Sequence, residues 1–422
     1  MSGRSALAAL LAEIVGNLFV SDDPTMCAEF AVHRVLPACV VAPGTFEQLA
    51  AVMATAHAAG AVVVPWGGGT QQLIGGPPEQ VDLVVRTGRL NRVLIHEPDD
   101  LTISVEAGMT LGALHRHLAA HNQMLPINPP LPEATTIGGL LATAMDGPRR
   151  LGYGTLRDLL IGIGVVDVAG RATKAGGMVV KNVSGFDMMK LYHGSFGTLA
   201  VIASANFKLL PMPRAMAALL CCFPTREDVF GTLADLHASQ LTPSAAEYLN
   251  SAALRQLSLE GAHAVYLLAE GLPQAVKRHV SEFIAIVHAH RGQIEQVGED
   301  NALGQRVADL PQTLRVAPDE AVVKIVTLPG ELAAALDMLE TLAPGAAVSA
   351  RALDGVAYAR LGGTNAAQLV ALAARQWGLQ WIATPIADAP RWGALPEGAA
   401  LMRRIKLEFD PSGQLNPGRF AV

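Results

Sequence analysis

VVVPWGGGTQQLIGG, residues 62–76, places five glycines directly after an apolar run rich in β-branched residues. Such a run is typical of a buried strand. Because glycine lacks a Cβ atom and tolerates positive φ, consecutive backbone N–H groups in this loop can turn toward one bound anion. Hydrogen bonds to a charged group contribute roughly 1.5–3 kcal/mol each, so three or four suffice to hold a diphosphate. The alternative is a glycine-rich hairpin between two strands, and this stretch alone leaves both interpretations open.

Two common phosphate-binding motifs do not match this loop. A Rossmann fingerprint reads G-x-G-x-x-G and opens into a helix, whereas this chain continues with two more glycines and then Pro77 and Pro78. A Walker loop needs a Lys after its last glycine, and none follows here. We therefore expect neither a Rossmann nicotinamide site nor nucleoside triphosphate hydrolysis.

Composition limits the class of protein. The 422 residues are enough for about two to three domains, and 51% of them are apolar, as in a well-buried globular protein. A net charge of −6 without a Lys/Arg block argues against nucleic-acid binding. Apolar runs fall short of the roughly 18 residues of a spanning helix, and the start is typical of a capped helix over 5–15, not of a signal peptide. These features predict a cytoplasmic protein without direct membrane insertion.

Cysteine and histidine spacing indicates no metal site. The four cysteines form no C-x-x-C pair, so neither an iron–sulfur cluster nor a zinc knuckle is expected. His117 and His121 stand four residues apart and share a helix face, but the sequence shows no third ligand beside them. His288 and His290 are two apart on a predicted helix and diverge. The prediction for metals is therefore none.

The chain changes in character near PMPRA, residues 211–215, where two prolines end a strong strand pattern. Before this point, Thr45 is a predicted cap for a helix over 47–60, and strands are predicted at 61–66 and 82–87. After it, short strands alternate with alanine-rich helices, predicted at residues 226–239, 273–290, 330–342 and 364–377. This second part predicts a small antiparallel sheet covered by helices.

Three more glycine-bearing segments follow the loop, at 131–170, 180–211 and 409–420. Together the four segments resemble the flavoproteins with a PCMH-type FAD-binding domain, the vanillyl-alcohol oxidase group, in which the glycine loop holds the FAD pyrophosphate. GPRRLGYGTLRD (147–158) and KNVSGFDMMKLYHGSFGTLAVI (181–202) are most similar to the FAD-binding E subunits of bacterial three-subunit glycolate oxidases. The implied fold class is α+β, with a two-part PCMH-type FAD-binding domain and a smaller α+β cap domain.

The resemblance also implies boundaries and cofactor contacts. The implied parts are an N-terminal helical extension (1–34), the FAD-binding domain (35–213), the cap domain (214–400) and a C-terminal segment that returns to the FAD domain (401–422). The implied FAD contacts, in chain order from the pyrophosphate loop to the tail, are Pro65, Trp66, Gly67, Gly68, Gly69, Thr70, Thr135, Thr136, Gly138, Gly139, Gly147, Tyr153, Gly154, Gly185, Gly194, Val201, Ile202 and Asn416. A bulky side chain at Gly68 is expected to occupy the place of the diphosphate. Where this group often carries a flavin-linking His, the chain has Thr70, which implies non-covalent FAD.

Related catalytic subunits carry an H-x-G-D-G-N-x-H segment that this chain lacks, so its catalytic residues are unknown. The resemblance implies an FAD-dependent oxidoreductase subunit of a glycolate oxidase-like 2-hydroxy acid dehydrogenase complex that takes part in electron transfer. Its implied partners are a homologous catalytic FAD subunit and an iron–sulfur subunit, and through them it would lie peripheral to the inner membrane. The alternatives are a self-sufficient dehydrogenase of glycolate or D-lactate, and a scaffold that has lost FAD, against which the intact glycine loop argues.

Five arginines are candidates for charged contacts. Arg351 and Arg360 are candidates for the fork that binds a substrate carboxylate, with an ordinary surface arginine as the alternative for each. Arg149, Arg150 and Arg157 lie inside the matched motif, where a flavin-side or partner contact competes with a structural ion pair near Asp158.

Overall fold

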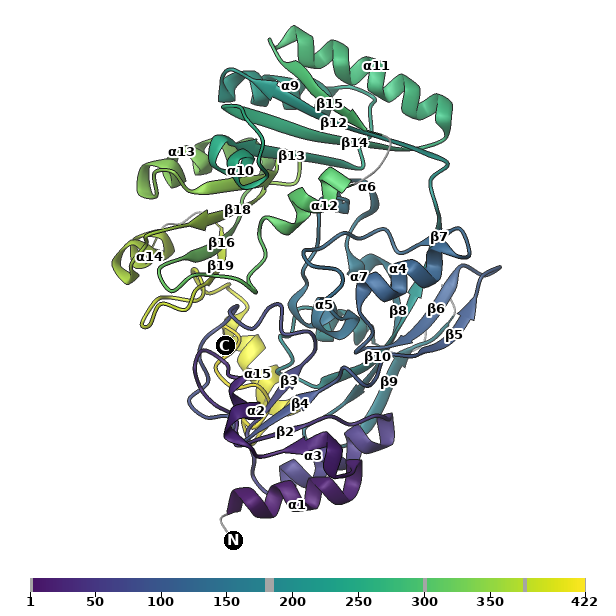
Figure 1. Ribbon diagram of the computed structural model, residues 1–422, viewed down its shortest axis with the longest axis vertical. Coiled ribbons are helices and arrows are strands. Elements are labelled where there is room, and N and C mark those ends of the chain that lie inside the picture. The colour runs from purple at the N-terminus through teal and green to yellow at the C-terminus, as the bar shows by residue number, and fades with distance from the viewer. Residues whose placement is uncertain (1–2, 179–185, 299–301, 375–377, 422) are drawn as a thin grey trace.

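The computed structural model describes residues 3–178, 186–298, 302–374 and 378–421. Its strands form two groups (Figure 1): the smaller sheets lie toward the N-terminus, and one large sheet lies at the opposite end of the molecule. Helix α15 (Ala399–Phe409) brings the C-terminus back to the first group. Within the described chain, no helix combines the length and apolar content needed to cross a membrane.

The first sheet has four strands in the order β1-β2-β4-β3. Its members are β1 (Val20–Ser21), β2 (Cys39–Val41), β3 (Val63–Trp66) and β4 (Leu83–Arg86). Helix α3 (Phe46–Ala58) links β2 to β3 and begins where the Thr45 side chain accepts a hydrogen bond from the Gln48 N–H, as the sequence predicts. Helix α1 (Gly3–Val15) packs against α3 and closes this core, with the short helices η1 (Asn17–Phe19) and α2 (Pro24–Ala28) following it.

The second sheet is antiparallel, with five strands in the order β5-β6-β10-β8-β9. These are β5 (Val93–Glu97), β6 (Thr102–Glu106), β8 (Leu160–Val166), β9 (Ala172–Gly176) and β10 (Val201–Lys208). Helices α4 (Leu111–Ala119) and α5 (Ile137–Thr143) bury their apolar faces against it. The smaller elements nearby are β7 (Gln123–Met124), α6 (Arg150–Tyr153), α7 (Leu156–Leu159), α8 (Met189–Tyr192) and β11 (Leu210–Pro211).

The large sheet has eight antiparallel strands in the order β15-β12-β14-β13-β17-β18-β16-β19. They are β12 (Ala215–Phe223), β13 (Ala245–Asn250), β14 (His263–Gly271), β15 (Gln293–Gly298), β16 (Ala321–Val326), β17 (Ala347–Arg351), β18 (Val356–Leu361) and β19 (Leu379–Ala383). The helices are α9 (Arg226–Ala238), α10 (Ser251–Gln256), α11 (Pro273–Ala289), α12 (Ala302–Asp309), η2 (Pro329–Glu331), α13 (Leu332–Leu342) and α14 (Ala366–Ala373).

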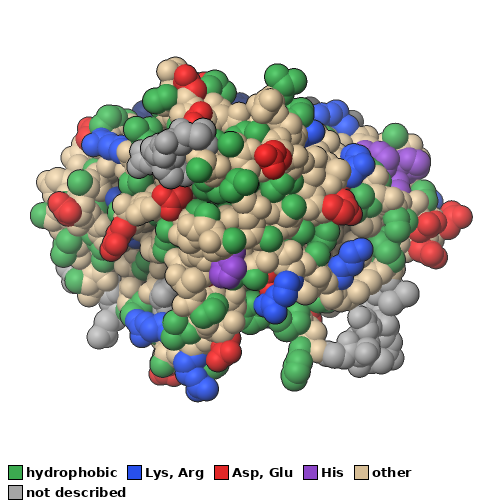
Figure 2. Space-filling model, turned by 90° about the horizontal axis from the view of Figure 1, so that it is seen from below, with side chains coloured by type: hydrophobic (Ala, Val, Ile, Leu, Met, Phe, Trp, Pro, Cys, Tyr) green, Lys and Arg blue, Asp and Glu red, His purple; other side chains and the backbone are tan. Residues whose placement is uncertain are grey.

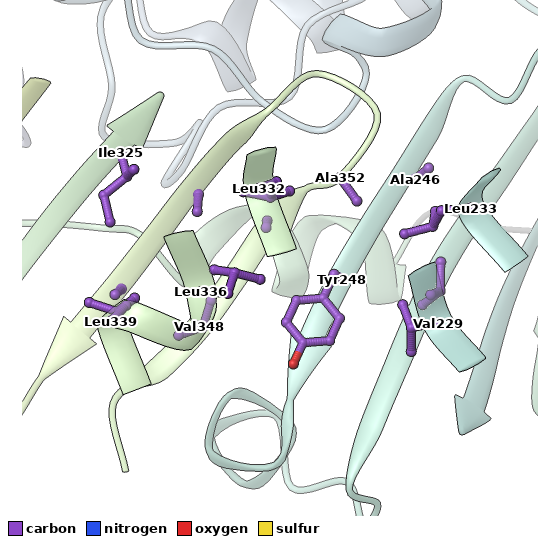
Figure 3. Packing of buried hydrophobic residues seen from close by; sticks show 14 of the residues in the cluster. Val229, Leu233, Ala246, Tyr248, Ile325, Leu332, Leu336, Leu339, Val348 and Ala352 are labelled. Carbon is purple, nitrogen blue, oxygen red and sulfur yellow. The ribbon is translucent and has the colours of Figure 1, made fainter. Parts of the chain in front are cut away.

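Helices cover both faces of this sheet because successive strand residues point to opposite sides. Tyr248 of β13 packs with Leu233 of α9 and Leu336 of α13 on one face (Figure 3). Its neighbour Leu249 joins α10 and α12 on the other face. The α+β class and the antiparallel sheet with helices are therefore confirmed, but the expectation of a small sheet is wrong, since its eight strands outnumber those of every other sheet in the described chain.

The two groups of strands share one core. Tyr358 of β18 and Trp381 of β19 are buried in the same apolar cluster as Ile163 of β8 and Phe207 of β10. The tail after α15 lies along β3: the Val63 N–H donates to the Gln414 carbonyl, and the Asn416 N–H donates to the Val63 carbonyl, both at 2.8 Å. Tail and glycine loop therefore meet at one end of the first sheet.

Candidate functional site

The glycine loop connects two strands that run in the same direction. β3 and β4 are parallel neighbours, with Val64 opposite Val84. Parallel neighbours cannot be joined by a hairpin, because the chain must return to its starting end before the second strand begins. The hairpin alternative is therefore wrong, and residues 67–82 form a crossover loop at the carboxyl end of β3.

The glycines of this loop are required by close packing against residues 134–136. A Cβ atom on Gly68 would overlap the carbonyl oxygen of Ala134, and one on Gly67 would overlap the hydroxyl of Thr136. Gly69 has a φ of 72°, which favours glycine. The expectation that a side chain at Gly68 would enter the place of the diphosphate is therefore wrong in its direction, since that side chain would point into the protein.

A pocket opens beside the loop, between β3, α5, the start of β10 and the C-terminal tail. Its empty volume is about 740 Å³, including the part open to solvent. The predicted residues that line it are Pro65, Trp66, Gly67, Gly68, Gly69, Thr70, Thr136, Gly138, Gly139, Val201, Ile202 and Asn416. Four segments that are far apart in the sequence thus meet at one cavity.

The other predicted residues lie elsewhere. Thr135 is buried behind the loop, with its hydroxyl 3.2 Å from that of Thr70, and the N–H of Gly194 donates to the Leu141 carbonyl of α5. Gly147, Tyr153 and Gly154 are not part of the pocket lining and lie on the segment that faces the large sheet, where the N–H of Gly152 donates to the Ser244 carbonyl. Gly185 falls outside the described residues.

The pocket holds polar atoms that need a partner. Oε1 of Gln71 and Oδ1 of Asn416 are buried without a hydrogen-bond partner among the described residues, and both side chains belong to the lining. The Asn416 amide is oriented by its Nδ2, which donates to the Phe196 carbonyl at 2.5 Å. A buried acceptor left unpaired costs roughly 1–3 kcal/mol. These acceptors therefore fit a polar ligand that carries hydroxyl or N–H groups, as FAD does.

Arg419 adds a buried positive charge to the same lining. Its guanidinium donates to the carbonyls of Gln72, Ile74 and Gly76 at 2.6, 2.8 and 2.7 Å, all uncharged oxygens. Burial, with the neighbouring Arg391 as a second cause, lowers the pKa of Arg419 to about 9. A buried cation is costly unless an anion compensates it. The residues of the pocket thus fit an anionic dinucleotide such as FAD.

The sequence analysis missed part of this lining. The residues that it did not name are Gln71, Gln72, Thr87, Ala142, Thr143, Phe196, Gly197, Ala200 and Arg419. Arg419 is the one residue of this set that the sequence could have indicated, because it lies in the motif NPGR, three residues after the predicted contact Asn416. Lys406 of α15 holds this tail in place, because its Nζ donates to the carbonyls of Thr198 and Leu415 at 2.8 and 2.9 Å.

The arginines proposed for substrate binding are already occupied. Arg351 is buried, its guanidinium pairs with Asp146, and its Nε lies 3.7 Å from a Glu247 oxygen. Arg360 donates to the carbonyls of Gln312 and Arg315 and pairs with Glu320. The expectation that either supplies a free fork for a carboxylate is therefore wrong.

Two of the three arginines in the segment 147–158 form ion pairs within the protein, and these two have a structural role. Arg149 pairs with Glu270 of β14 at 2.6 Å, and Arg150 pairs with Asp146 at 2.5 Å. Arg157 is exposed, and the Asp158 carboxylate instead accepts from the N–H and hydroxyl of Thr155 at the start of α7.

The buried carboxyls at this junction titrate in opposite directions. Burial alone would raise the pKa of Asp146, but the charges of Arg351, Lys324 and Arg150 together outweigh it and hold that pKa well below its usual range. Burial raises the pKa of Glu247 to about 8, since it outweighs the opposing charge of Arg351, whose Nε lies 3.7 Å from the carboxyl. Glu247 is therefore mostly protonated at neutral pH, whereas Asp146 is charged.

Replacing Glu247 by Gln should remove part of the pH dependence of stability. An unfolded Glu titrates near 4.3, so between that pH and about 8 the folded chain holds a proton that the unfolded chain has lost. The free energy of unfolding of the parent should therefore fall as pH rises across this window, by up to about 1.4 kcal/mol per pH unit. Urea unfolding at pH 5, 6, 7 and 8 measures this slope. Glu247→Gln should flatten it and exposed Glu295→Gln should not; equal slopes in all three proteins would contradict the assignment.

Comparisons with known proteins agree with this site. A family model described as FAD binding domain matches residues 37–186, and one described as FAD linked oxidases, C-terminal domain, matches residues 392–420. The lining residues from Pro65 to Thr143 fall within the first matched segment, and Asn416 and Arg419 fall within the second.

Three relatives illustrate the range of similar proteins. The chain is 29% identical to glycolate oxidase subunit GlcD of Bacillus subtilis over 57% of this chain and 50% of that protein. It is 32% identical to D-lactate dehydrogenase of Archaeoglobus fulgidus over 55% and 51%. It is 36% identical to glycolate oxidase subunit GlcE of Escherichia coli over 36% and 43%. The chain spans about half the length of each of these three relatives.

Solved structures share the fold over nearly the whole chain. The 4-ethylphenol oxidase of Gulosibacter chungangensis aligns with a TM-score of 0.76 at 14% identity, and p-cresol methylhydroxylase aligns with a TM-score of 0.71 at 14% identity. Each alignment covers 99% of this chain and 97% of the other. With the glycine crossover loop and the returning tail, these findings show that the chain has the fold of these oxidases, with an FAD-binding domain matched at residues 37–186 and an FAD-linked oxidase C-terminal domain matched at residues 392–420.

Proposed function

We propose that this chain is the FAD-carrying subunit of a 2-hydroxy acid dehydrogenase complex of the glycolate oxidase type. The observation that carries the proposal is the pocket itself, where unpaired acceptors and the buried Arg419 face a cavity beside a glycine crossover loop. The relatives named glycolate oxidase subunit and D-lactate dehydrogenase support the substrate class. A bound flavin supplies an electron acceptor, and the residues of this chain position it.

The FAD is held without a covalent bond. None of the residues that line the pocket in the described chain is a His, Cys or Tyr, the side chains with a nucleophile suited to flavin attachment. Thr70 stands at the position where the resemblance implies a linking His. It is buried and bonded to the protein, since its backbone carbonyl accepts a hydrogen bond from the Thr313 hydroxyl at 2.8 Å.

The chain acts together with a catalytic partner. Oxidation of a 2-hydroxy acid requires a group that removes the hydroxyl proton, and the pocket lining in the described chain holds no His, Asp, Glu, Lys or Tyr. A homologous catalytic FAD subunit would perform that step, and an iron–sulfur subunit would carry the electrons onward. The subunit itself is cytoplasmic and reaches a membrane only through such partners. A self-sufficient glycolate or D-lactate dehydrogenase remains the second candidate, supported by the relatives' names.

The spectrum of the purified chain tests these statements. We expect flavin absorption that acid precipitation releases completely into the supernatant, since the cofactor is not covalently bound. Under anaerobic conditions, glycolate and D-lactate should leave the flavin bands unchanged, whereas dithionite should bleach them. Bleaching by either acid would establish the self-sufficient alternative. A colourless chain that takes up no added FAD would contradict the FAD assignment.

A further inference from the structure

Three histidines from different elements meet at the outer edge of the five-stranded sheet. His96 lies on β5, His117 on α4, and His121 just after α4. Their ring centroids are 4.7 to 5.5 Å apart, and one ligand nitrogen of each lies within 4.8 Å of the others. Figure 2 shows histidine side chains gathered at one edge of the molecule, near acidic ones. Among the described residues, no other group of three His, Cys, Asp or Glu side chains comes this close together.

A buried glutamine orients the first of these rings. Nε2 of Gln123 donates to the Pro98 carbonyl at 2.7 Å, so Oε1 of the same amide faces Nε2 of His96 at 2.9 Å. An amide oxygen only accepts, and His96 must therefore carry its proton on Nε2. Its Nδ1 is therefore an acceptor, and Nε2 of His117 donates to it at 3.1 Å, a hydrogen bond that a bound metal ion would replace. A metal-binding His typically donates its other N–H to an acceptor such as the Gln123 amide oxygen.

The spacing of the nitrogens suits a small transition-metal ion. Zn–N bonds of about 2.0–2.1 Å in tetrahedral geometry place neighbouring ligand nitrogens about 3.4 Å apart. The His96 and His117 nitrogens are already close to that separation, and the exposed His121 completes a set of three, which leaves the fourth position to water. Imidazole nitrogens favour Zn²⁺, Cu²⁺ and Ni²⁺ over Mg²⁺ or Ca²⁺.

We propose that His96, His117 and His121 form a binding site for one divalent transition-metal ion, with Zn²⁺ as the typical occupant and Gln123 as the positioning residue. The site is distinct from the flavin pocket, since none of the three histidines lines that pocket. It joins β5, the edge strand that pairs only with β6, to the end of α4. The metal would therefore hold the edge strand to the end of α4, and its binding would add to the free energy of unfolding by an amount that grows with the logarithm of its affinity.

The prediction that the chain has no metal site was based on a missing third ligand. The helix that was expected to carry both His117 and His121 ends at Ala119, so His121 follows α4, although the two rings still lie 5.5 Å apart. His96 precedes them by more than 20 residues and reaches them only through the tertiary structure. Sequence spacing reports neighbours within one helix and does not report this contact.

Calorimetric titration of Zn²⁺ into tag-free, chelator-treated full-length protein tests the site. We expect one saturable equivalent and a raised melting temperature. His96→Ala and His117→Ala should each weaken Zn²⁺ binding at least hundredfold and abolish the rise. Gln123→Leu should weaken it about 10- to 100-fold, the usual effect of losing a partner of a ligand. His288→Ala, which removes an exposed histidine from α11, should bind like the parent.

Two results would overturn the proposal: no saturable Zn²⁺ binding by the parent protein, or binding by His96→Ala with the affinity of the parent. Far-UV circular dichroism of each variant establishes that it is folded. FAD content, measured on the same samples, keeps this test separate from the flavin proposal, because loss of metal binding should leave FAD in place.

Discussion

Gly68→Val should purify without FAD and unfold more easily than the parent. The added Cβ overlaps the carbonyl oxygen of Ala134, a backbone atom that cannot rotate away, so the loop must lift off residues 134–136. Forcing extra atoms into a packed site costs typically about 1–3 kcal/mol, and the displaced loop no longer forms the wall of the pocket. Flavin absorbance per protein and the free energy of unfolding in urea measure the two effects.

Gly88→Ala is the matched control for this variant. Gly88 lies near the same loop, but nothing in the described chain comes within 4 Å of a Cβ built on it, and its φ is not in the left-handed region. We expect parent-like FAD content and stability. If Gly68→Val retained a full complement of FAD, the loop would not be part of the flavin site, whereas loss of FAD in Gly88→Ala would show that any change near the loop has this effect.

Arg419→Met should weaken FAD binding by about 100-fold. The guanidinium is a buried cation of the pocket lining, and its hydrogen bonds are to uncharged carbonyls. A hydrogen bond to a charged group contributes roughly 1.5–3 kcal/mol, and 1.4 kcal/mol corresponds to a factor of ten in the dissociation constant. Fluorescence titration of the apoprotein with FAD measures the change.

Riboflavin separates the electrostatic role of Arg419 from its structural one. Riboflavin lacks the phosphates, so a residue that compensates the diphosphate should affect FAD binding and leave riboflavin binding unchanged. Equal weakening of both ligands would mean that Arg419 only holds the carbonyls of residues 72–76 in place. Arg403→Met, on the exposed side of α15, is the control with the same change in charge and should bind both ligands like the parent.

Local sequence patterns predicted most elements of the fold correctly. The cap at Thr45 begins α3 as expected, and the alanine-rich segments of the second part became α9, α11, α13 and α14. Such features depend on residues within a few positions of one another, where hydrogen-bonding partners and apolar spacing can be read directly. Many of the residues that line the pocket were also predicted correctly, because they lie in short motifs that can be recognised as continuous stretches of sequence.

What the sequence by itself determined is therefore local: the helices and strands, and a glycine loop that needs bare backbone, whereas the return of the tail with Asn416 was implied by the family resemblance. Only the tertiary structure decided that the loop is a parallel crossover, that Gly68 faces Ala134, and that Arg351 is taken by Asp146. It also decided that His96 joins His117 and His121. The physical reason is that these contacts join residues distant in the chain, and their formation depends on sheet order and core packing, which no short stretch of sequence specifies.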